Sequence, residues 1–230
     1  MSETLVTTTH SIPSYLEPHS GVGTEHLTAD DVAMPRLSLA QAMSDQVNAT
    51  HADHIEGLKV GDFFNSVSGV VYGTKITFSL LVSYPPRAIE FSPMEQGGGV
   101  VDPNVPLTDP RLQFGADGSA PQATKFYDYI VMLSPGESEE MIAMSLARSG
   151  IKAAKSLNGL VQMRGTAIFT GLYTAESVAK NSQQGSYMSW RFRNAGFIPE
   201  ALVARYAELH AGLKSQTLTT DDAPVVETPF

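Results

Sequence analysis

A single helical pattern interrupts the strand-like segments between Lys59 and Phe197, and this order limits the folds open to the chain. Residues 75–84 (KITFSLLVSY) are rich in β-branched and aromatic residues, which is typical of a buried strand. Residues 146–163 repeat apolar side chains at helical spacing, and residues 199–214 form a second such segment that begins with proline. Because helices and strands do not alternate, a doubly wound parallel sheet is excluded. Further strands are predicted at 61–69, 87–91, 125–134, 165–174 and 186–197.

These segments predict a mainly β fold with some α (α+β): an OB-fold-like, partly open barrel of five or six strands, with one central and one C-terminal helix. A generic α+β sandwich fits the same order nearly as well. Residues 27–44 predict an extended lead-in with a short helix. The Pro/Gly/Asp-rich residues 93–124 predict a long loop, and such loops are functional or disordered. The expected divisions are a flexible, disordered arm over 1–30, one domain over 31–214, and a flexible acidic tail over 215–230.

Composition places the chain among globular proteins, with 42% hydrophobic and 17% charged residues. The absence of cysteine excludes disulfides, thiolate metal sites and cysteine nucleophiles. The first residues lack the basic start and apolar run of a signal peptide, and no stretch approaches the ~20 apolar residues of a membrane span. We therefore expect a cytoplasmic protein with no membrane partner.

Charge is distributed unevenly along the chain. Residues 1–144 carry 6 Lys or Arg and 18 Asp or Glu, whereas residues 145–214 carry 9 Lys or Arg and 3 Glu. The tail adds three acidic residues and no basic one. Such asymmetry points to an interaction surface accompanied by an acidic arm, although sequence segments need not be separate surfaces.

Motifs for catalysis are weak or missing. The glycines at 97–99 do not lie between a strand and a helix, and no phosphate-binding loop or nucleophile elbow is present. His51 and His54 could hold a metal, but spacing supplies no further ligand. The acidic pairs at 30–31 and 139–140 could serve a metal-dependent nuclease, although adjacent acids more often face water. The prediction is a protein that is not an enzyme and has no cofactor or metal.

Basic and aromatic side chains alternate with apolar ones near the end of the chain. In residues 186–194 (SYMSWRFRN), two-residue alternation puts Tyr187, Arg191 and Arg193 on the face opposite the apolar side chains. Single-stranded nucleic acid needs this combination, because cations bind phosphates and rings stack unpaired bases. The alternative is an ordinary half-exposed strand, which often carries the same residue types.

A second strand-like segment, 125–133, repeats this pattern with Lys125, Tyr127 and Tyr129 on one face. Lys152 and Lys155 lie three apart on the helix between the two strands, where they could equally be a solvated face. The candidate nucleic-acid-binding residues are Lys125, Tyr127, Tyr129, Lys152, Lys155, Tyr187, Arg191 and Arg193, with Tyr84 and Arg87 as weaker additions.

Two segments resemble the C-terminal half of phage-encoded single-stranded DNA-binding proteins. They are MIAMSLARSGIKAAKSLNGLVQMRG and AIFTGLYTAESVAKNSQQGSYMSWRF, in which a strand, a helix and a hairpin follow one another. Upstream, DDVAMPRLSLAQAMS and VGDFFNSVSGVVYG resemble the beginning of the same proteins. The resemblance is one of layout and covers about residues 28–197.

The last ten residues, DDAPVVETPF, resemble the acidic tip of bacterial and phage single-stranded DNA-binding proteins. Val225 and Val226 interrupt the acids here, which weakens the electrostatic part of the likeness. The resemblance implies a tip that recruits replication or recombination proteins and competes with DNA for the basic groove. A frayed end and a phenylalanine folded back on the body are the alternatives. The implied tip residues are Asp221, Asp222, Glu227, Pro229 and Phe230.

The expected function is therefore binding of single-stranded DNA with little sequence preference during phage DNA replication, recombination or repair. Its partners would be single-stranded DNA and the proteins that bind the tail, and a homodimer is one option for its oligomeric state. Two other functions stay open: a structural or decoration component of a phage virion, and a metal-dependent nuclease or nuclease accessory.

Overall fold

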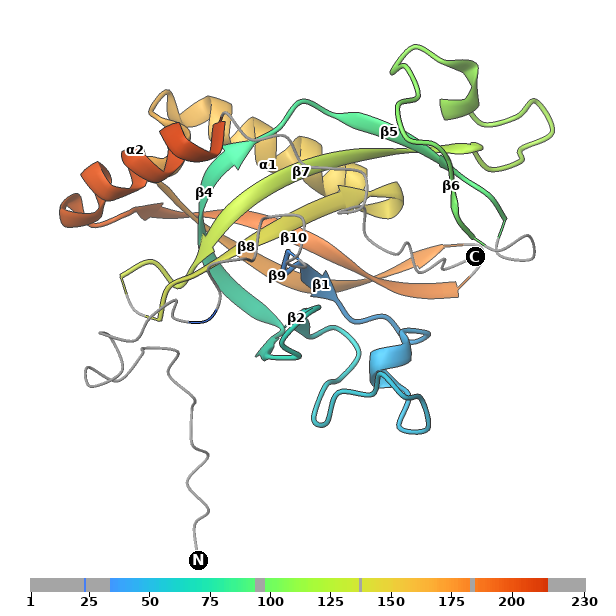
Figure 1. Cartoon of the computed structure of the whole chain (residues 1–230), viewed down its shortest axis with the longest axis horizontal. Helices are drawn as coiled ribbons and strands as arrows, with labels where there is room; N and C mark the ends of the chain where they lie inside the picture. Colours follow the sequence, from blue (N-terminus) through green and yellow to red (C-terminus); the bar gives the residue numbers. More distant parts are fainter. Residues whose placement is uncertain (1–22, 24–33, 94–97, 137, 183–184, 215–230) are drawn as a thin grey trace, which may run out of the picture.

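The computed structural model describes residues 23, 34–93, 98–136, 138–182 and 185–214, whose strands form two antiparallel sheets (Figure 1). The small sheet has the order β1 (Leu37–Leu39), β2 (Phe63–Asn65), β3 (Val71–Gly73). The large sheet has the order β10 (Gly185–Phe197), β9 (Gly171–Ser182), β4 (Lys75–Ser83), β7 (Ala123–Leu133), β5 (Arg87–Phe91), β6 (Val100–Asp102), with β8 (Glu140–Ala147) also paired to β7. The helices are α1 (Ile151–Arg164) and α2 (Glu200–Lys214).

Strand β7 is the centre of the large sheet. One of its edges pairs with β8 from Phe126 to Leu133. Its other edge is shared, because residues 123–126 pair with β5 and residues 129–133 pair with β4. The β4–β5 segment therefore acts as one long strand interrupted at residues 84–86, where the amide of Tyr84 still donates to the carbonyl of Asp128 at 2.9 Å.

Two hydrophobic cores lie on opposite faces of this sheet, and each is covered by one helix. On the first face α1 buries Ala153, Ala154 and Leu157 against side chains of β4, β7, β8, β9 and β10. On the second face α2 buries Tyr206 and Leu213 against a separate cluster. No helix in the described part of the chain is long and apolar enough to cross a membrane.

Residues 34–73 form a lobe that approaches the free edge of β10. The side-chain amide of Gln41 accepts a hydrogen bond from the amide of Met188 at 2.9 Å and donates to its carbonyl at 3.1 Å. Phe63 packs on Trp190 with 4.7 Å between ring centroids. The molecule is thus mainly β with two helices, as predicted, but its sheets do not close into a barrel.

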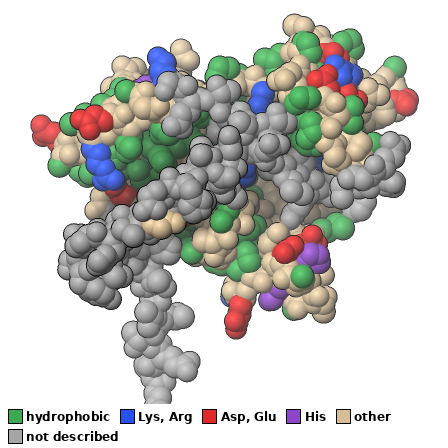
Figure 2. All heavy atoms as spheres, in the orientation of Figure 1, with side chains coloured by type: hydrophobic (Ala, Val, Ile, Leu, Met, Phe, Trp, Pro, Cys, Tyr) green, Lys and Arg blue, Asp and Glu red, His purple; other side chains and the backbone are tan. Residues whose placement is uncertain are grey.

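The segment predicted as a long loop (93–124) is partly ordered. It contains β6 and a 3₁₀ turn at Pro110–Leu112, and the Arg111 guanidinium ties it together. The Arg111 Nη atoms lie 2.5 Å from Glu90, 3.0 Å from Asp102 and 2.9 Å from Asp109. Figure 2 shows red and blue side chains gathered at the upper right, where this segment projects from the sheet. The single positive charge of Arg111 is therefore paired with three carboxylates within this segment and β5.

Several predicted boundaries differ from the structure. The central helix begins at Ile151 because Leu146 and Ala147 still belong to β8. The strand predicted at 165–174 starts only at Gly171, after a 3₁₀ turn, and it continues to Ser182 through residues that lie between two predicted strands. The lead-in at 27–44 contributes β1 rather than a helix among its described residues.

Candidate nucleic-acid interface

The outer face of the β9–β10 hairpin carries three cations around one carboxylate. The Glu176 carboxylate lies 2.9 Å from Arg191, 3.5 Å from Lys75 and 3.7 Å from Arg193. Strand register brings them together, because Glu176 pairs with Arg191 on β10 and with Lys75 on β4. The side chains of Lys75, Arg191 and Arg193 are each at least half exposed. The cluster therefore has a positive surplus that faces solvent.

The pKa of Glu176 reflects these neighbours. Partial desolvation acts to raise its pKa, but the hydrogen bond and charge of Arg191, with the charges of Lys75 and Arg193, outweigh this and lower the pKa below the ordinary range. Glu176 is thus an anion at neutral pH. It holds the two guanidinium groups close together without neutralising all three cations.

A second basic and aromatic group lies at the start of β7. The Lys125 ammonium stands 5.1 Å from the centroid of the Tyr127 ring, and both side chains are half-buried. They lie on the sheet face that α1 covers, since Tyr127 packs against the same core as Ala154. A cation over an aromatic ring at this distance offers a phosphate contact next to a stacking surface.

Helix α1 places Lys152 and Lys155 in solvent, because its buried side chains all point toward the sheet. The turn before the helix holds Arg148 at a φ of 47°, a left-handed backbone that non-glycine residues adopt at a cost. Such conformations cluster at functional sites. Arg148 adds a further cation at the beginning of α1.

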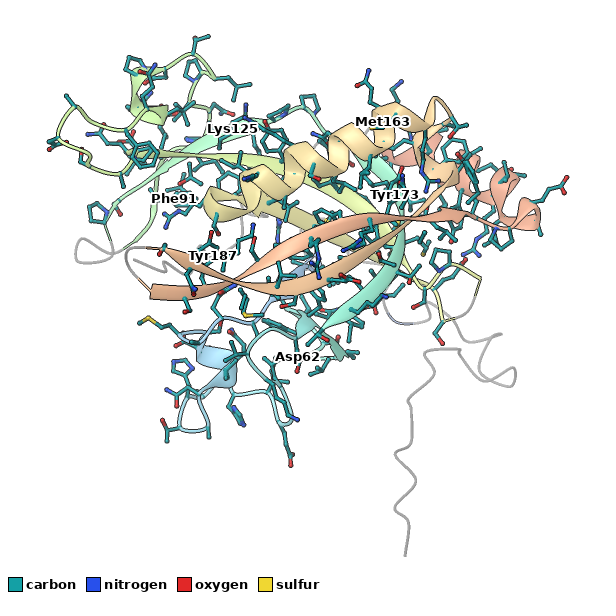
Figure 3. All side chains as sticks on the ribbon, turned by 180° about the vertical axis from the view of Figure 1, so that it is seen from behind. Asp62, Phe91, Lys125, Met163, Tyr173 and Tyr187 are labelled. Atoms are coloured by element: carbon teal, nitrogen blue, oxygen red, sulfur yellow. The ribbon has the colours of Figure 1, made fainter. Side chains whose placement is uncertain are left out.

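Together α1, β9 and β10 carry a single acid, Glu176, against six basic residues. Helix α1 packs against both β7 and β10. Figure 3 shows Lys125 and Tyr187 on opposite sides of the half of α1 that lies farther from Met163. The basic residues lie on both sides of the sheet: Lys125, Lys152 and Lys155 lie on the α1 side, and the hairpin cations lie with Lys75 on the other. We call the two areas together the basic face. Its basic residues are Lys75, Lys125, Arg148, Lys152, Lys155, Lys180, Arg191 and Arg193.

Three of the predicted binding residues lie elsewhere. Tyr129 is 1% exposed and its hydroxyl donates to Asn158 at 2.8 Å, so the prediction that its ring could stack a base is wrong. Burial also raises its pKa. Alternation along the strand was predicted correctly, but α1 covers the face at this point.

Arg87 and Tyr84 lie on the other face of the sheet. Arg87 binds the buried Asp128 at 2.7 Å, and the Tyr84 hydroxyl donates to the carbonyl of Leu213 on α2 at 3.1 Å. Both side chains are engaged in holding the fold together. The remaining predicted residues, Lys125, Tyr127, Lys152, Lys155, Tyr187, Arg191 and Arg193, belong to the basic face.

The acidic pair at 139–140 has structural partners. Glu139 accepts from the Tyr206 hydroxyl at 2.7 Å, and Glu140 accepts from Asn65 and Tyr72, both at 2.7 Å. Within the described ranges, no three His, Cys, Asp or Glu side chains lie close enough to hold a metal ion. The pair at 30–31 lies outside these residues, as do all five residues of the predicted tip, Asp221, Asp222, Glu227, Pro229 and Phe230.

Sequence reasoning missed Lys75, Arg148 and Lys180. Lys75 and Lys180 join the face through strand register, since Lys180 pairs with Tyr187 and Lys75 with Glu176. That register cannot be read from one sequence when the hairpin itself is predicted too short. Arg148 was visible as part of the basic segment but was assigned to the helix.

The chain matches the family described as Pam3 phage gp34-like protein over residues 6–219. No curated protein and no solved structure is significantly similar to it. Because the family match spans most of the sequence, the chain belongs to the Pam3 phage gp34-like protein family.

Proposed function

We propose that this phage-family protein binds single-stranded DNA with little sequence preference during phage DNA replication or recombination. The observation that carries the proposal is the basic face, to which α1, β9 and β10 contribute five basic residues and one acid. A chain with a net charge of −9 has no general attraction for DNA, so a local cationic surface has to provide it.

Aromatic rings favour a single strand over a duplex. Tyr127 lies beside Lys125 on one side of α1, and Tyr187 lies on the other side (Figure 3). A duplex keeps its bases paired, whereas a single strand can stack them on exposed rings at ~1–3 kcal/mol per base. Few base-edge contacts are needed for this kind of binding, so sequence preference is slight.

An opened OB barrel would suit the same function, because OB folds bind oligonucleotides on a partly open barrel. Three features are compatible with it: a core between α1 and one face of the large sheet, a helix that connects β8 to β9, and the Gln41 amide that joins the lobe to β10. We infer an opened variant of that architecture, acting in the host cytoplasm.

The tail completes the proposal. Its three acids and terminal Phe230 can compete with DNA for the basic face and recruit a replication or recombination protein. The virion-component function would use the same tail for assembly and leave DNA affinity unchanged. The nuclease function would need a divalent ion, with Asp30 and Asp31 as ligands.

The experiment that tests the proposal compares a labelled single strand of about 30 nucleotides with the matching duplex, at two salt concentrations. The full chain and a chain ending at Lys214 are titrated in parallel. We expect binding to the single strand only, and tighter binding after removal of the tail. Equal affinity for strand and duplex, or none for either, would rule out the proposed function and favour the virion component.

Replacing Glu176 by glutamine is expected to tighten DNA binding roughly threefold to tenfold at about 50 mM salt, because the substitution removes the only acid on α1, β9 and β10. Affinity for the labelled single strand measures the effect. Glu208→Gln makes the same charge change on α2, outside the basic face, and should leave affinity unchanged. Unchanged or weaker binding by Glu176→Gln would contradict a phosphate contact at this cluster.

A further inference from the structure

Phe197 at the end of β10 is an exposed aromatic ring that belongs to neither hydrophobic core. Its side chain is 60% exposed. It pairs with Gly171, and the register shifts between Asn194 and Gly196. Without this bulge, two-residue alternation would put Phe197 on the same face as Arg193. The bulge turns the ring over to the side of the sheet on which α1 lies.

Arg164, the last residue of α1, supports this ring from behind. Its guanidinium lies 4.7 Å from the centroid of Phe197 and 4.7 Å from that of the buried Tyr173, so it is held between two rings. It also donates to the carbonyl of Leu172 at 2.8 Å, to the side chain of Asn194 at 3.2 Å, and to the carbonyl of Gly196. Arg164 is fixed by these contacts, and Phe197 rests on a rigid backing.

The position of Phe197 continues the basic face. Lys152 and Lys155 lie near the beginning of α1, and Met163, which is 84% exposed, lies near its end (Figure 3). The helical rise puts about 16 Å between Lys152 and Met163. A strand that follows α1 from its lysines therefore reaches Arg164 and Phe197 at the far end.

We propose that Phe197, backed by Arg164, is a platform on which an unpaired base stacks. This inference rests on the proposed single-stranded DNA binding and adds the residue that marks one end of the bound strand. A ring with its rear covered and its front open offers a preformed stacking surface, and stacking of this kind is tolerant of base identity. Phe197 is a contact residue and Arg164 its positioning residue.

The test uses full-length Phe197→Ala with two ligands: an oligothymidine of about 30 nucleotides, and an oligomer of the same length that lacks bases throughout. We expect Phe197→Ala to bind oligothymidine about 5- to 150-fold more weakly than the wild type. Both proteins should bind the abasic oligomer equally. The salt dependence should stay the same, because no cation is removed. Phe197→Tyr should restore binding and Phe197→Leu should not.

Phe114→Ala is the matched control, since Phe114 is 73% exposed in the segment between β6 and β7 and should not affect either ligand. Equal loss of affinity for both oligomers would show that Phe197 acts through the fold, and would overturn the inference. Unchanged affinity of Phe197→Ala for oligothymidine would overturn it while leaving the proposed function intact. If the wild type does not bind oligothymidine, the proposed function fails and this inference fails with it.

Discussion

Replacing Asp128 by alanine is expected to lower the free energy of unfolding by about 3–5 kcal/mol, since it removes the carboxylate from a buried charged network. Asp128 is 1% exposed and lies on β7, where it accepts from Arg87 at 2.7 Å and from the Ser145 hydroxyl at 2.5 Å. Ser145 in turn accepts from Arg36 at 2.8 Å. Two guanidinium groups from distant parts of the chain are thus linked to one carboxylate, Arg87 directly and Arg36 through Ser145.

Urea unfolding of the full chain measures this effect. Glu208→Ala removes an exposed acid from α2 and should change stability by less than about 0.5 kcal/mol. Ser145→Ala should fall between the two, at about 1–3 kcal/mol, because it interrupts only the path to Arg36. If Asp128→Ala does not fold, Asp128→Asn keeps the volume and loses the charge. If the Asp128 variants were as stable as Glu208→Ala, the stabilising role of the Asp128 network would be contradicted.

Replacing Lys152 and Lys155 together by glutamine is expected to have a large effect on DNA binding. Both side chains are exposed, and neither forms an ion pair with another described residue, so the fold should tolerate the change. Loss of two phosphate contacts should reduce the slope of log affinity against log salt by about 1.4. Extrapolated from about 1 M, this amounts to roughly 60-fold weaker binding at about 50 mM salt.

The measurement is a salt titration of single-stranded binding, with Lys59→Gln/Lys214→Gln as the control. That pair changes the net charge equally but lies on the N-terminal lobe and at the end of α2. The control should keep the wild-type slope. Equal loss in both double variants would indicate a general charge effect and remove α1 from the binding surface.

Regular, strongly patterned strands were predictable from sequence. Residues 75–84 and 87–91 correspond closely to β4 and β5, because β-branched and aromatic residues there supply the buried face of the sheet. The face carrying Arg191 and Arg193 was also predicted correctly from alternation. Alternation of apolar and polar residues was sufficient to predict a strand wherever one face of that strand is buried and the other faces solvent.

Tertiary contacts account for the differences. Residues 175–182 are polar and lie between two predicted strands, yet they form the second half of β9 because β10 pairs with them along their whole length. Tyr129 resembles Tyr127 in sequence, but only Tyr129 lies beneath Asn158 of α1. The contact between Arg164 and Phe197 depends on a bulge for which the strand pattern gives no signal.

The free edge of β10 shows how the molecule avoids unwanted strand pairing. At 13 residues, β10 is the longest described strand, and an open edge of this kind is a template for aggregation with other chains. Gln41 occupies the amide and carbonyl of Met188 on this edge. Helix α1 packs against the same strand. A side chain of the 34–73 lobe thus blocks strand addition at Met188, and the outer face of the hairpin stays open to solvent.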